Sequence, residues 1–280
     1  MTRTTRSRFA TLALIGALLT GSAIPAHATP DELYVGSVAM DIPAAMHKRL
    51  TPLVDYLRSE LQYPVSLKLS ADLSTAASDV AASRVHIAYL TPVAYLKAHK
   101  EGQVRLVAKP VTQGQSSFKL MLVTQTNSAI HSPKDLAGKS FAFGDKSAIL
   151  QRAVVVGAGV DIDKLGSVNY LGHYDNIARG VLAGDFDAGI VKDTTAYDWK
   201  DKGLRVFYSS PELPPYNIVV SRDVDDRMYQ KIRAALLKLD PKNPTHRTVI
   251  KSLDESYDGF VPTSDAEYGV VRELIKPFSK

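Results

Sequence analysis

The fold is decided by the stretch Arg84–Ala98, RVHIAYLTPVAYLKA. A short apolar run, His86–Leu90, is followed at once by Thr91 and then by a helical pattern over Pro92–Lys100. Threonine before proline is typical of a helix start, because the hydroxyl caps a free backbone N–H and proline fits the first helical position. The stretch therefore predicts a buried strand, a tight turn and a helix.

The same strand–turn–helix unit repeats on both sides of this stretch. In the N-terminal part we expect strands at Leu33–Val38, Pro64–Leu69 and Val104–Ala108, a helix from Pro43 and a helix over Leu73–Ala82. Strands that alternate with helices in this way predict a parallel sheet with helices on its faces.

After a polar loop at 112–117 the alternation of strands and helices begins again. Further strands are expected at 118–123, 140–143, 167–170, 188–191, 205–208 and 216–220, and further helices at 147–158, 174–183, 195–200, 225–239 and 265–278. Two mostly parallel α/β lobes, joined by two extended crossings near 118–124 and 209–221, account for this order. The first lobe would hold residues 29–120 and 220–280, and the second residues 121–219.

The N-terminus has the pattern of a secretory signal peptide. Arg3, Arg6 and Arg8 precede the apolar run Phe9–Ile24, and Ala26-His27-Ala28 supplies small residues at a cleavage site. The alternative, a membrane anchor, needs about 20 apolar residues without polar interruptions. We therefore expect cleavage after Ala28 and export, to the periplasm.

Composition and charge exclude several classes of protein. The chain has 34 Lys and Arg against 29 Asp and Glu, and removal of the three arginines of the leader leaves a nearly neutral chain. Because the chain has no run of basic residues, it lacks the charge pattern of a nucleic-acid-binding protein. The chain has no cysteine, so disulfides and thiolate zinc sites are excluded.

The candidate binding residues lie in the turns that follow the strands. In open parallel sheets ligands bind outside the carboxyl ends of the strands, where helix N-termini present free N–H groups. These turns contain Thr91, Lys146, Ser147, His173, Asp193 and Thr194. Such residues suit an anion held by hydroxyls, backbone amides and a cation, although the hydroxyls alone could simply be helix caps.

Catalytic and metal-binding patterns are weak. We find no nucleophile elbow, no P-loop and no zinc-protease motif. The six histidines after residue 28 are not spaced closely enough to indicate metal ligands. His173 and Asp175 could be half of a hydrolase's catalytic group, but no serine or cysteine nucleophile is marked. The sequence thus predicts neither an enzyme nor a metal or cofactor site.

Four runs resemble the periplasmic phosphate-, phosphite- and phosphonate-binding proteins of ABC importers. They are the opening stretch, LGHYDNIARGVLAGDFDAGIVKD (171–193), SSPELPPYNIVVSRDVDDRMYQKIRAALLKLD (209–240) and YDGFVPTSDAEYGVVREL (257–274). The resemblance implies a two-lobed periplasmic binding protein of the second structural type, a monomer that closes over a small anion and delivers it to a membrane permease. The alternative is a sensor subunit that presents its closed form to a membrane histidine kinase.

The resemblance also implies roles for single residues. His173 matches the family histidine that reaches the ligand's oxyanion, and Thr91 and Tyr95 fall in the turn and helix that line the first lobe. At 143–155 the family usually has a phosphate-binding loop with the sequence D-P-x-S-T-S-G. This chain has FGDKSAILQRAVV there, so that Ser147 is the hydroxyl that remains and Lys146 lies beside it. Tyr216 and Thr194, with Asp193 adjacent, stand where aminophosphonate binders carry acidic residues.

Overall fold

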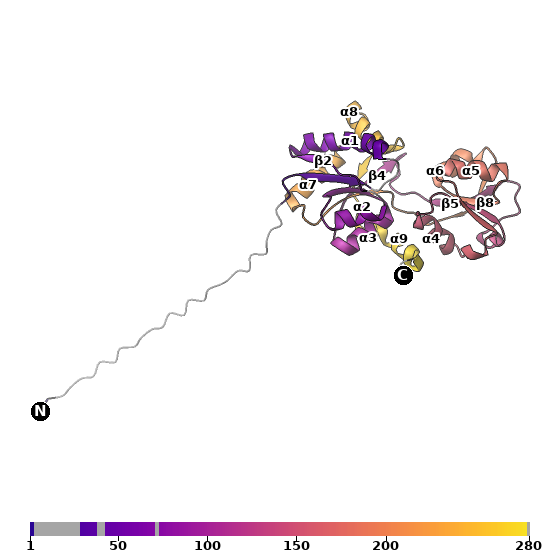
Figure 1. Ribbon diagram of the computed structural model, residues 1–280, viewed down its shortest axis with the longest axis horizontal. Helices are drawn as coiled ribbons and strands as arrows, with labels where there is room; N and C mark the ends of the chain where they lie inside the picture. The colour runs from indigo at the N-terminus through magenta and orange to yellow at the C-terminus, as the bar shows by residue number, and fades with distance from the viewer. Residues whose placement is uncertain (3–28, 38–42, 71–72, 279–280) are drawn as a thin grey trace.

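The protein consists of two lobes, each a β-sheet covered by helices (Figure 1). The structure is a computed structural model that describes residues 1–2, 29–37, 43–70 and 73–278. The two sheets confirm the expected α/β architecture, and each sheet mixes parallel and antiparallel pairs.

The first lobe contains the sheet β11-β4-β10-β3-β1-β2. Its strands are β1 (Leu33–Ser37), β2 (Val65–Leu67), β3 (Ile87–Leu90), β4 (Arg105–Thr112), β10 (Asn217–Val220) and β11 (Tyr257–Val261). Strand β1 pairs in parallel with β2 and β3, whereas β10 runs antiparallel between β3 and β4. Strands β1 to β4 therefore point the same way, as the alternation of strands and helices predicts.

Helices cover both faces of this sheet. They are α1 (Pro43–Leu61), α2 (Leu73–Ala81), α3 (Pro92–Gly102), α7 (Asp226–Leu237) and α8 (Pro244–Leu253). Helix α1 forms where expected, because Leu50, Leu53 and Leu57 recur at helical spacing and are fully buried. They pack in one core with residues of α7 and α8, while α2 and α3 contribute to a second core on the other face.

The second lobe contains the sheet β7-β6-β8-β5-β9. Its elements are β5 (Leu120–Gln125), β6 (Ser140–Phe143), α4 (Ile149–Gly157), β7 (Ser167–Tyr170), α5 (Tyr174–Ala183), β8 (Ala188–Lys192), α6 (Asp193–Lys200) and β9 (Leu204–Ser209), with short 3₁₀ turns at Pro133–Leu136 and Ile162–Lys164. Strand β6 is parallel to β7 and β8, and β5 is antiparallel to β8 and β9.

Two short segments, 113–119 and 210–216, connect the sheets. They pair with each other, since Phe118 and Leu213 exchange backbone hydrogen bonds of 3.0 and 2.8 Å. The first crossing was expected at 118–124, but most of that range is β5 of the second sheet. The second was expected at 209–221 and ends in β10, because 217–220 pair with both β3 and β4.

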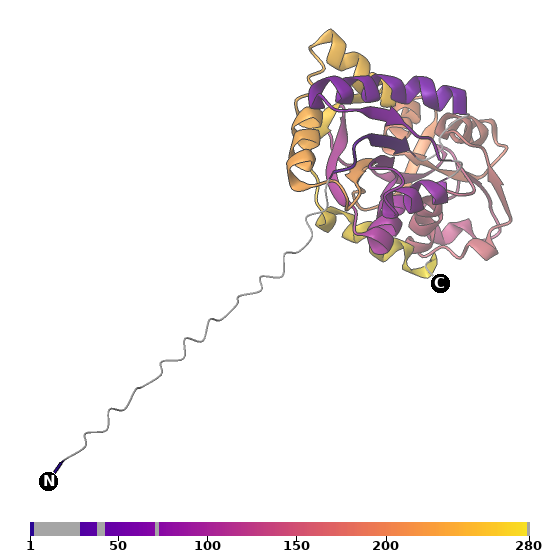
Figure 2. The same cartoon turned by 60° about the vertical axis from the view of Figure 1, so that its left-hand side comes forward.

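The C-terminal segment lies against both lobes. It comprises a 3₁₀ turn at Asp265–Tyr268, α9 (Gly269–Ile275) and a last turn at Lys276–Phe278, where a single helix was expected. Helix α9 contacts α3 of the first lobe and α4 of the second (Figure 1). In Figure 2 the same yellow segment runs along one edge of the molecule.

Helix α8 and strand β11 are not indicated by the strand and helix pattern described above. Helix α8 has a local start signal, because the Asn243 side chain accepts hydrogen bonds from the backbone N–H groups of Thr245 and His246 and Pro244 follows it. Strand β11 has little local signal, since it contains Gly259 at φ 147° and is held by β4, far away in the sequence. None of the helices in the described ranges is long and apolar enough to cross a membrane.

Candidate ligand-binding site

Two turns of the second lobe are fastened together at Gly144. This residue follows β6, and its N–H donates to Gln151 Oε1 over 2.8 Å, while its carbonyl accepts from the N–H of Gly172 over 3.0 Å. A Cβ at position 144 would lie 2.7 Å from Gln151 Nε2 and 3.2 Å from the Gly172 oxygen. A larger residue at 144 would have to displace the Gln151 amide. The hydrogen bond between Gly144 and Gly172 joins the 144–148 turn to the 171–174 turn.

Gln151 also connects these turns to the start of α5. It is a buried residue of α4, 6% exposed, and its Nε2 donates to the Tyr174 hydroxyl over 3.4 Å. Burial raises the pKa of Tyr174 to about 12, although the bond with Gln151 opposes the shift. Tyr174 is therefore a neutral, fixed residue directly after His173.

The unit exposes Lys146, Ser147 and His173. Ser147 donates both its N–H and its hydroxyl to Asp145 Oδ1, each over 2.7 Å. Lys146 forms no ion pair with any described residue, including the neighbouring Asp145. His173 is the N-cap residue of α5, and its ring makes no capping bond.

The start of α4 differs from the expectation. The helix was expected from Ser147, but it begins at Ile149 with Ala148 as its N-cap and no side-chain cap. Ser147 instead closes a turn with Asp145, as serine and aspartate commonly do when they bond to nearby backbone. The serine is thus not a helix cap.

In the first lobe Thr91 is the cap that the sequence indicates. Its Oγ1 accepts from the Ala94 N–H over 3.1 Å at the start of α3. The hydroxyl proton of Thr91 is not used by this bond, and the side chain is half-buried. Thr91 can therefore cap the helix and still donate to a ligand.

Tyr95 has contacts that do not suit the expected role. It is 1% exposed, its hydroxyl donates to Asp265 Oδ1 over 2.6 Å, and its ring lies 4.6 Å from that of Tyr268. The face of α3 that carries Tyr95 packs against the C-terminal segment. We therefore leave Tyr95 out of the candidate site.

Tyr216 stands where the second connection enters the first lobe. Its ring stacks on that of Tyr89 with centroids 5.0 Å apart. Burial raises the pKa of Tyr216 to about 12, with smaller effects from Asp254, Arg49 and Asp145. Because Asp145 belongs to the 144–148 turn, charges of both lobes act on this phenol.

Asp193 fastens the first connection to the second lobe. It is the first residue of α6, and its Oδ2 accepts from the Lys119 N–H over 2.7 Å while its Oδ1 accepts from the Thr194 N–H over 2.8 Å. Thr194 therefore lies inside α6 and is not its cap, which is Lys192. Both residues lie at the end of β8, where a ligand of the second sheet is expected.

Sequence reasoning missed Asp145, Gln151 and Tyr174. A signal existed for Gln151, since it and Arg152 are the polar residues within the otherwise apolar run AILQRAVV (148–155). Among the described residues, no group of three or more histidines and carboxylates could hold a metal ion.

Comparison with known proteins identifies the family. Residues 35–268 match the family described as "ABC transporter, phosphonate, periplasmic substrate-binding protein". The phosphate-import protein PhnD of Mycolicibacterium smegmatis is 22% identical over 299 residues, which cover 95% of this chain and 92% of the relative.

Solved structures share the fold. PhnD1 from Prochlorococcus marinus, in complex with methylphosphonate, has a TM-score of 0.69 at 19% identity and covers 90% of this chain and 100% of its own. XAC2383 from Xanthomonas citri, bound to ATP, has a TM-score of 0.72 at 18% identity and covers 88% of this chain and 96% of its own. These similarities confirm the expected two-lobed binding-protein fold.

The family match confirms the resemblance seen in the sequence and favours import over the sensor alternative, for which these comparisons give no support. Members of the family are transport proteins of the periplasm, not enzymes, with a small anionic ligand and a membrane permease as partners. The chain belongs to the family of periplasmic substrate-binding proteins of phosphonate ABC transporters.

Proposed function

We propose that the chain binds a small phosphorus oxyanion between its lobes, through Lys146, Ser147 and His173 of the second lobe and Thr91 and Tyr216 of the first. The observation that carries this proposal is the joining of the 144–148 and 171–174 turns by Gly144, Gly172 and Gln151. It holds three exposed donors at the carboxyl ends of neighbouring parallel strands, β6 and β7.

The electrostatics of this edge favour an anion. Helices α4 and α5 both begin here, and helix N-termini attract anions through free N–H groups and the helix dipole. Lys146 and His173 can add charge-assisted hydrogen bonds, which are about twice as strong as neutral ones. Thr91 and Tyr216 would supply neutral hydroxyls from the opposite lobe when the lobes close.

The relatives support a phosphorus oxyanion as the ligand class. The curated relative is named for phosphate import, and the two solved relatives hold methylphosphonate and ATP. All three compounds carry a tetrahedral phosphorus with several anionic oxygens. Phosphonate, phosphite and phosphate are thus the first candidates for this chain.

Isothermal titration calorimetry with phosphate, phosphite and methylphosphonate tests the proposal. A lost hydrogen bond to a charged group costs about 1.5–3 kcal/mol, so His173→Ala and Lys146→Ala should each weaken binding roughly ten- to a hundredfold. His131→Ala, at an exposed histidine of the same lobe, is the control and should bind like the parent. If both site variants stay within twofold of the parent, the anion binds elsewhere.

We also propose that binding closes the lobes about the 113–119 and 210–216 connections, with the lobe boundaries inside these segments. Hinge closure is common in binding proteins, and hinges consist of a few residues between elements. Small-angle scattering should show compaction in saturating ligand. An unchanged radius of gyration would contradict closure.

Export is the remaining part of the proposed function. Residues 1–28 would be a signal peptide, cut after Ala28, and the released protein would work as a monomer in the periplasm. Intact-mass measurement of periplasmic protein should give a chain that starts at Thr29. Material that retains Met1 would contradict the proposed cleavage.

A further inference from the structure

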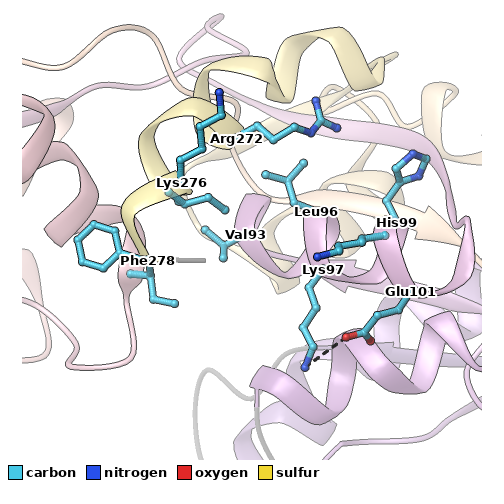
Figure 3. Close-up of a pocket in the computed structure, with 11 residues that line it drawn as sticks. Val93, Leu96, Lys97, His99, Glu101, Arg272, Lys276 and Phe278 are labelled. Carbon is cyan, nitrogen blue, oxygen red and sulfur yellow. Dashed lines mark ion pairs between the residues drawn. The ribbon is translucent and has the colours of Figure 1, made fainter. Parts of the chain in front are cut away.

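A cavity of about 520 Å³ lies where α3, α4 and the C-terminal segment meet (Figure 3). Its walls come from both lobes, since Val93 and Leu96 belong to α3 of the first lobe and Ile149 to α4 of the second. Ligand pockets typically have volumes of about 300–1,000 Å³ and occur preferentially between domains. The cavity therefore has the size and place of a binding pocket that changes when the lobes move.

The cavity adjoins the proposed oxyanion site. Val93 follows Thr91 by two residues, and Ile149 follows Ser147 by two. Along α3 these two residues span about 3 Å of the helix axis, whereas Ser147 lies in the turn just before α4, which begins at Ile149. A group attached to an oxyanion at the starts of α3 and α4 can therefore reach the cavity, which none of the proposed oxyanion ligands lines.

The inner wall of the cavity is apolar. Val93, Leu96 and Ile149 are joined there by Ile275 and Phe278 of the C-terminal segment. Figure 3 shows Phe278 and Val93 near one another and Leu96 below Arg272. These five side chains suit an alkyl or aryl group of several carbons, because apolar surface on both partners is removed from water.

The rim of the cavity is cationic. Lys97, Lys100, Arg272 and Lys276 line it, against the single carboxylate of Glu101. Glu101 lies 4.0 Å from Lys97, and carboxylates outside the cavity pair with Arg272 and Lys276. Lys100 is exposed and has no ion-pair partner within the described ranges. The uncompensated positive charge is therefore that of Lys100, which favours an anionic group over a cationic one at this place.

We propose that this cavity receives the organic substituent of the ligand, and that the preferred substrates are phosphonates with an apolar chain ending in a second anionic group. The inference rests on the proposed function, because the phosphonate group must sit at Lys146, Ser147 and His173. It predicts discrimination against aminoalkyl phosphonates, whose ammonium group would meet the cationic rim.

Calorimetry with four probes tests the inference: methylphosphonate, hexylphosphonate, 6-phosphonohexanoate and 6-aminohexylphosphonate. Each buried methylene should tighten binding about fourfold, so burial of two of the five additional carbons gives roughly fifteenfold for hexylphosphonate over methylphosphonate. The carboxylate probe should bind at least as tightly as hexylphosphonate, and the amino probe several-fold more weakly.

Variants connect these differences to the cavity. Ile275→Trp fills it and should reduce the affinity for hexylphosphonate about tenfold while methylphosphonate binds within twofold of the parent. Ile149→Phe narrows it from the other lobe and should act in the same direction, so the test does not depend on one variant folding. Lys100→Glu should weaken only the carboxylate probe, and Lys134→Glu, at an exposed lysine of the second lobe, should weaken none.

The outcomes separate the two proposals. If methylphosphonate binds and neither chain length nor the filling variants change affinity, the cavity inference is overturned and the proposed function stands. If none of the four probes binds but phosphate or phosphite does, the cavity inference is overturned and the proposed function stands. If phosphate and phosphite also fail to bind, both are overturned.

Discussion

Asp145 occupies both hydrogen-bond donors of Ser147, the backbone N–H and the hydroxyl, each at 2.7 Å from the same carboxylate oxygen. The serine that should meet an oxyanion is therefore bonded to a negative charge. Either the anion draws these donors away from Asp145, or it binds beside a like charge. In both cases the carboxylate opposes anion binding.

Asp145→Asn should therefore strengthen anion binding. The amide keeps an oxygen that can accept both bonds and removes the charge. Two unit charges 4 Å apart interact by about 1 kcal/mol in water, which corresponds to roughly fivefold in affinity. Titration calorimetry with methylphosphonate at low and moderate salt measures the effect, which should shrink as salt increases. The control is Asp163→Asn, at an exposed aspartate of the same lobe. Unchanged or weaker binding by Asp145→Asn would show that the anion does not approach Ser147.

Gln151 should act as a positioning residue for the same site. Gln151→Leu keeps the shape but leaves the buried N–H of Gly144 without its partner at 2.8 Å, which should cost about 1–3 kcal/mol of unfolding free energy. It should also weaken anion binding several-fold, because the two turns are no longer fastened. Tyr174→Phe removes only the 3.4 Å bond and should have a smaller effect on both.

Urea unfolding and calorimetry of the same samples check this prediction. Gln230→Leu, at an exposed glutamine of α7, is the matched control and should change neither quantity. Loss of stability without loss of affinity would mean that Gln151 supports the fold but not the site.

The elements that were predicted correctly are specified by residues close to them in the sequence. Helix α3 starts at Thr91 and Pro92 because a capping hydroxyl and a proline specify the first turn by themselves. Strand β11 escaped prediction because its partner β4 lies more than a hundred residues away, and a Gly259 at φ 147° breaks the alternation that marks a strand. Non-local pairing is not encoded in the pattern of the strand itself.

The contrast between local and non-local causes also applies to the candidate site. Ser147 and His173 were proposed because turns after parallel strands are the usual ligand positions, and the structure places both in exposed turns of the second lobe. Tyr95 was expected to line the first lobe, but its hydroxyl donates to Asp265, 170 residues away, a contact that the sequence of α3 does not indicate. Gln151 was missed because its partners, Gly144 and Tyr174, meet it only after the turns have folded.

The ion pair of Lys109 with Glu267 should make stability depend on pH. Lys109 is 6% exposed, and its ammonium donates to Glu267, which also accepts from Thr263 and from the backbone of Ser264. Burial alone would raise the pKa of Glu267, but these hydrogen bonds outweigh it and lower the pKa below its ordinary 4.5. A lowered folded-state pKa gives stability that is present above about pH 4.5 and is lost as the pH falls through the folded value.

Glu267→Gln should therefore lower the free energy of unfolding at neutral pH by about 1.5–3 kcal/mol, the usual size of a hydrogen bond to a charged group. The difference from the parent should shrink in acid, where the parent loses the same interaction. Urea unfolding at several pH values measures both. Glu273→Gln removes the exposed pair with Lys276 and should change stability by less than about 0.5 kcal/mol. A difference that is constant from neutral to acid pH would assign the loss to packing.

The hydroxyls of Tyr89 and Tyr257 should be strongly coupled. They lie 2.5 Å apart, and the side chains are 2% and 4% exposed. Burial raises the pKa of both phenols, so the shared hydrogen bond is between neutral groups. Tyr257→Phe leaves the Tyr89 hydroxyl buried without a partner, which should cost about 1–3 kcal/mol, and Tyr89→Phe does the same to Tyr257.

The double variant Tyr89→Phe with Tyr257→Phe should be more stable than either single variant, because no buried hydroxyl is then unpartnered. The ring of residue 89 still stacks on Tyr216, so methylphosphonate should bind to the double variant nearly as it binds to the parent. Tyr197→Phe, at a tyrosine that is 62% exposed, is the control for loss of a solvated hydroxyl. Urea unfolding of the four proteins gives the coupling energy directly. Single losses that simply add in the double variant would mean that each hydroxyl finds another partner, most simply a buried water.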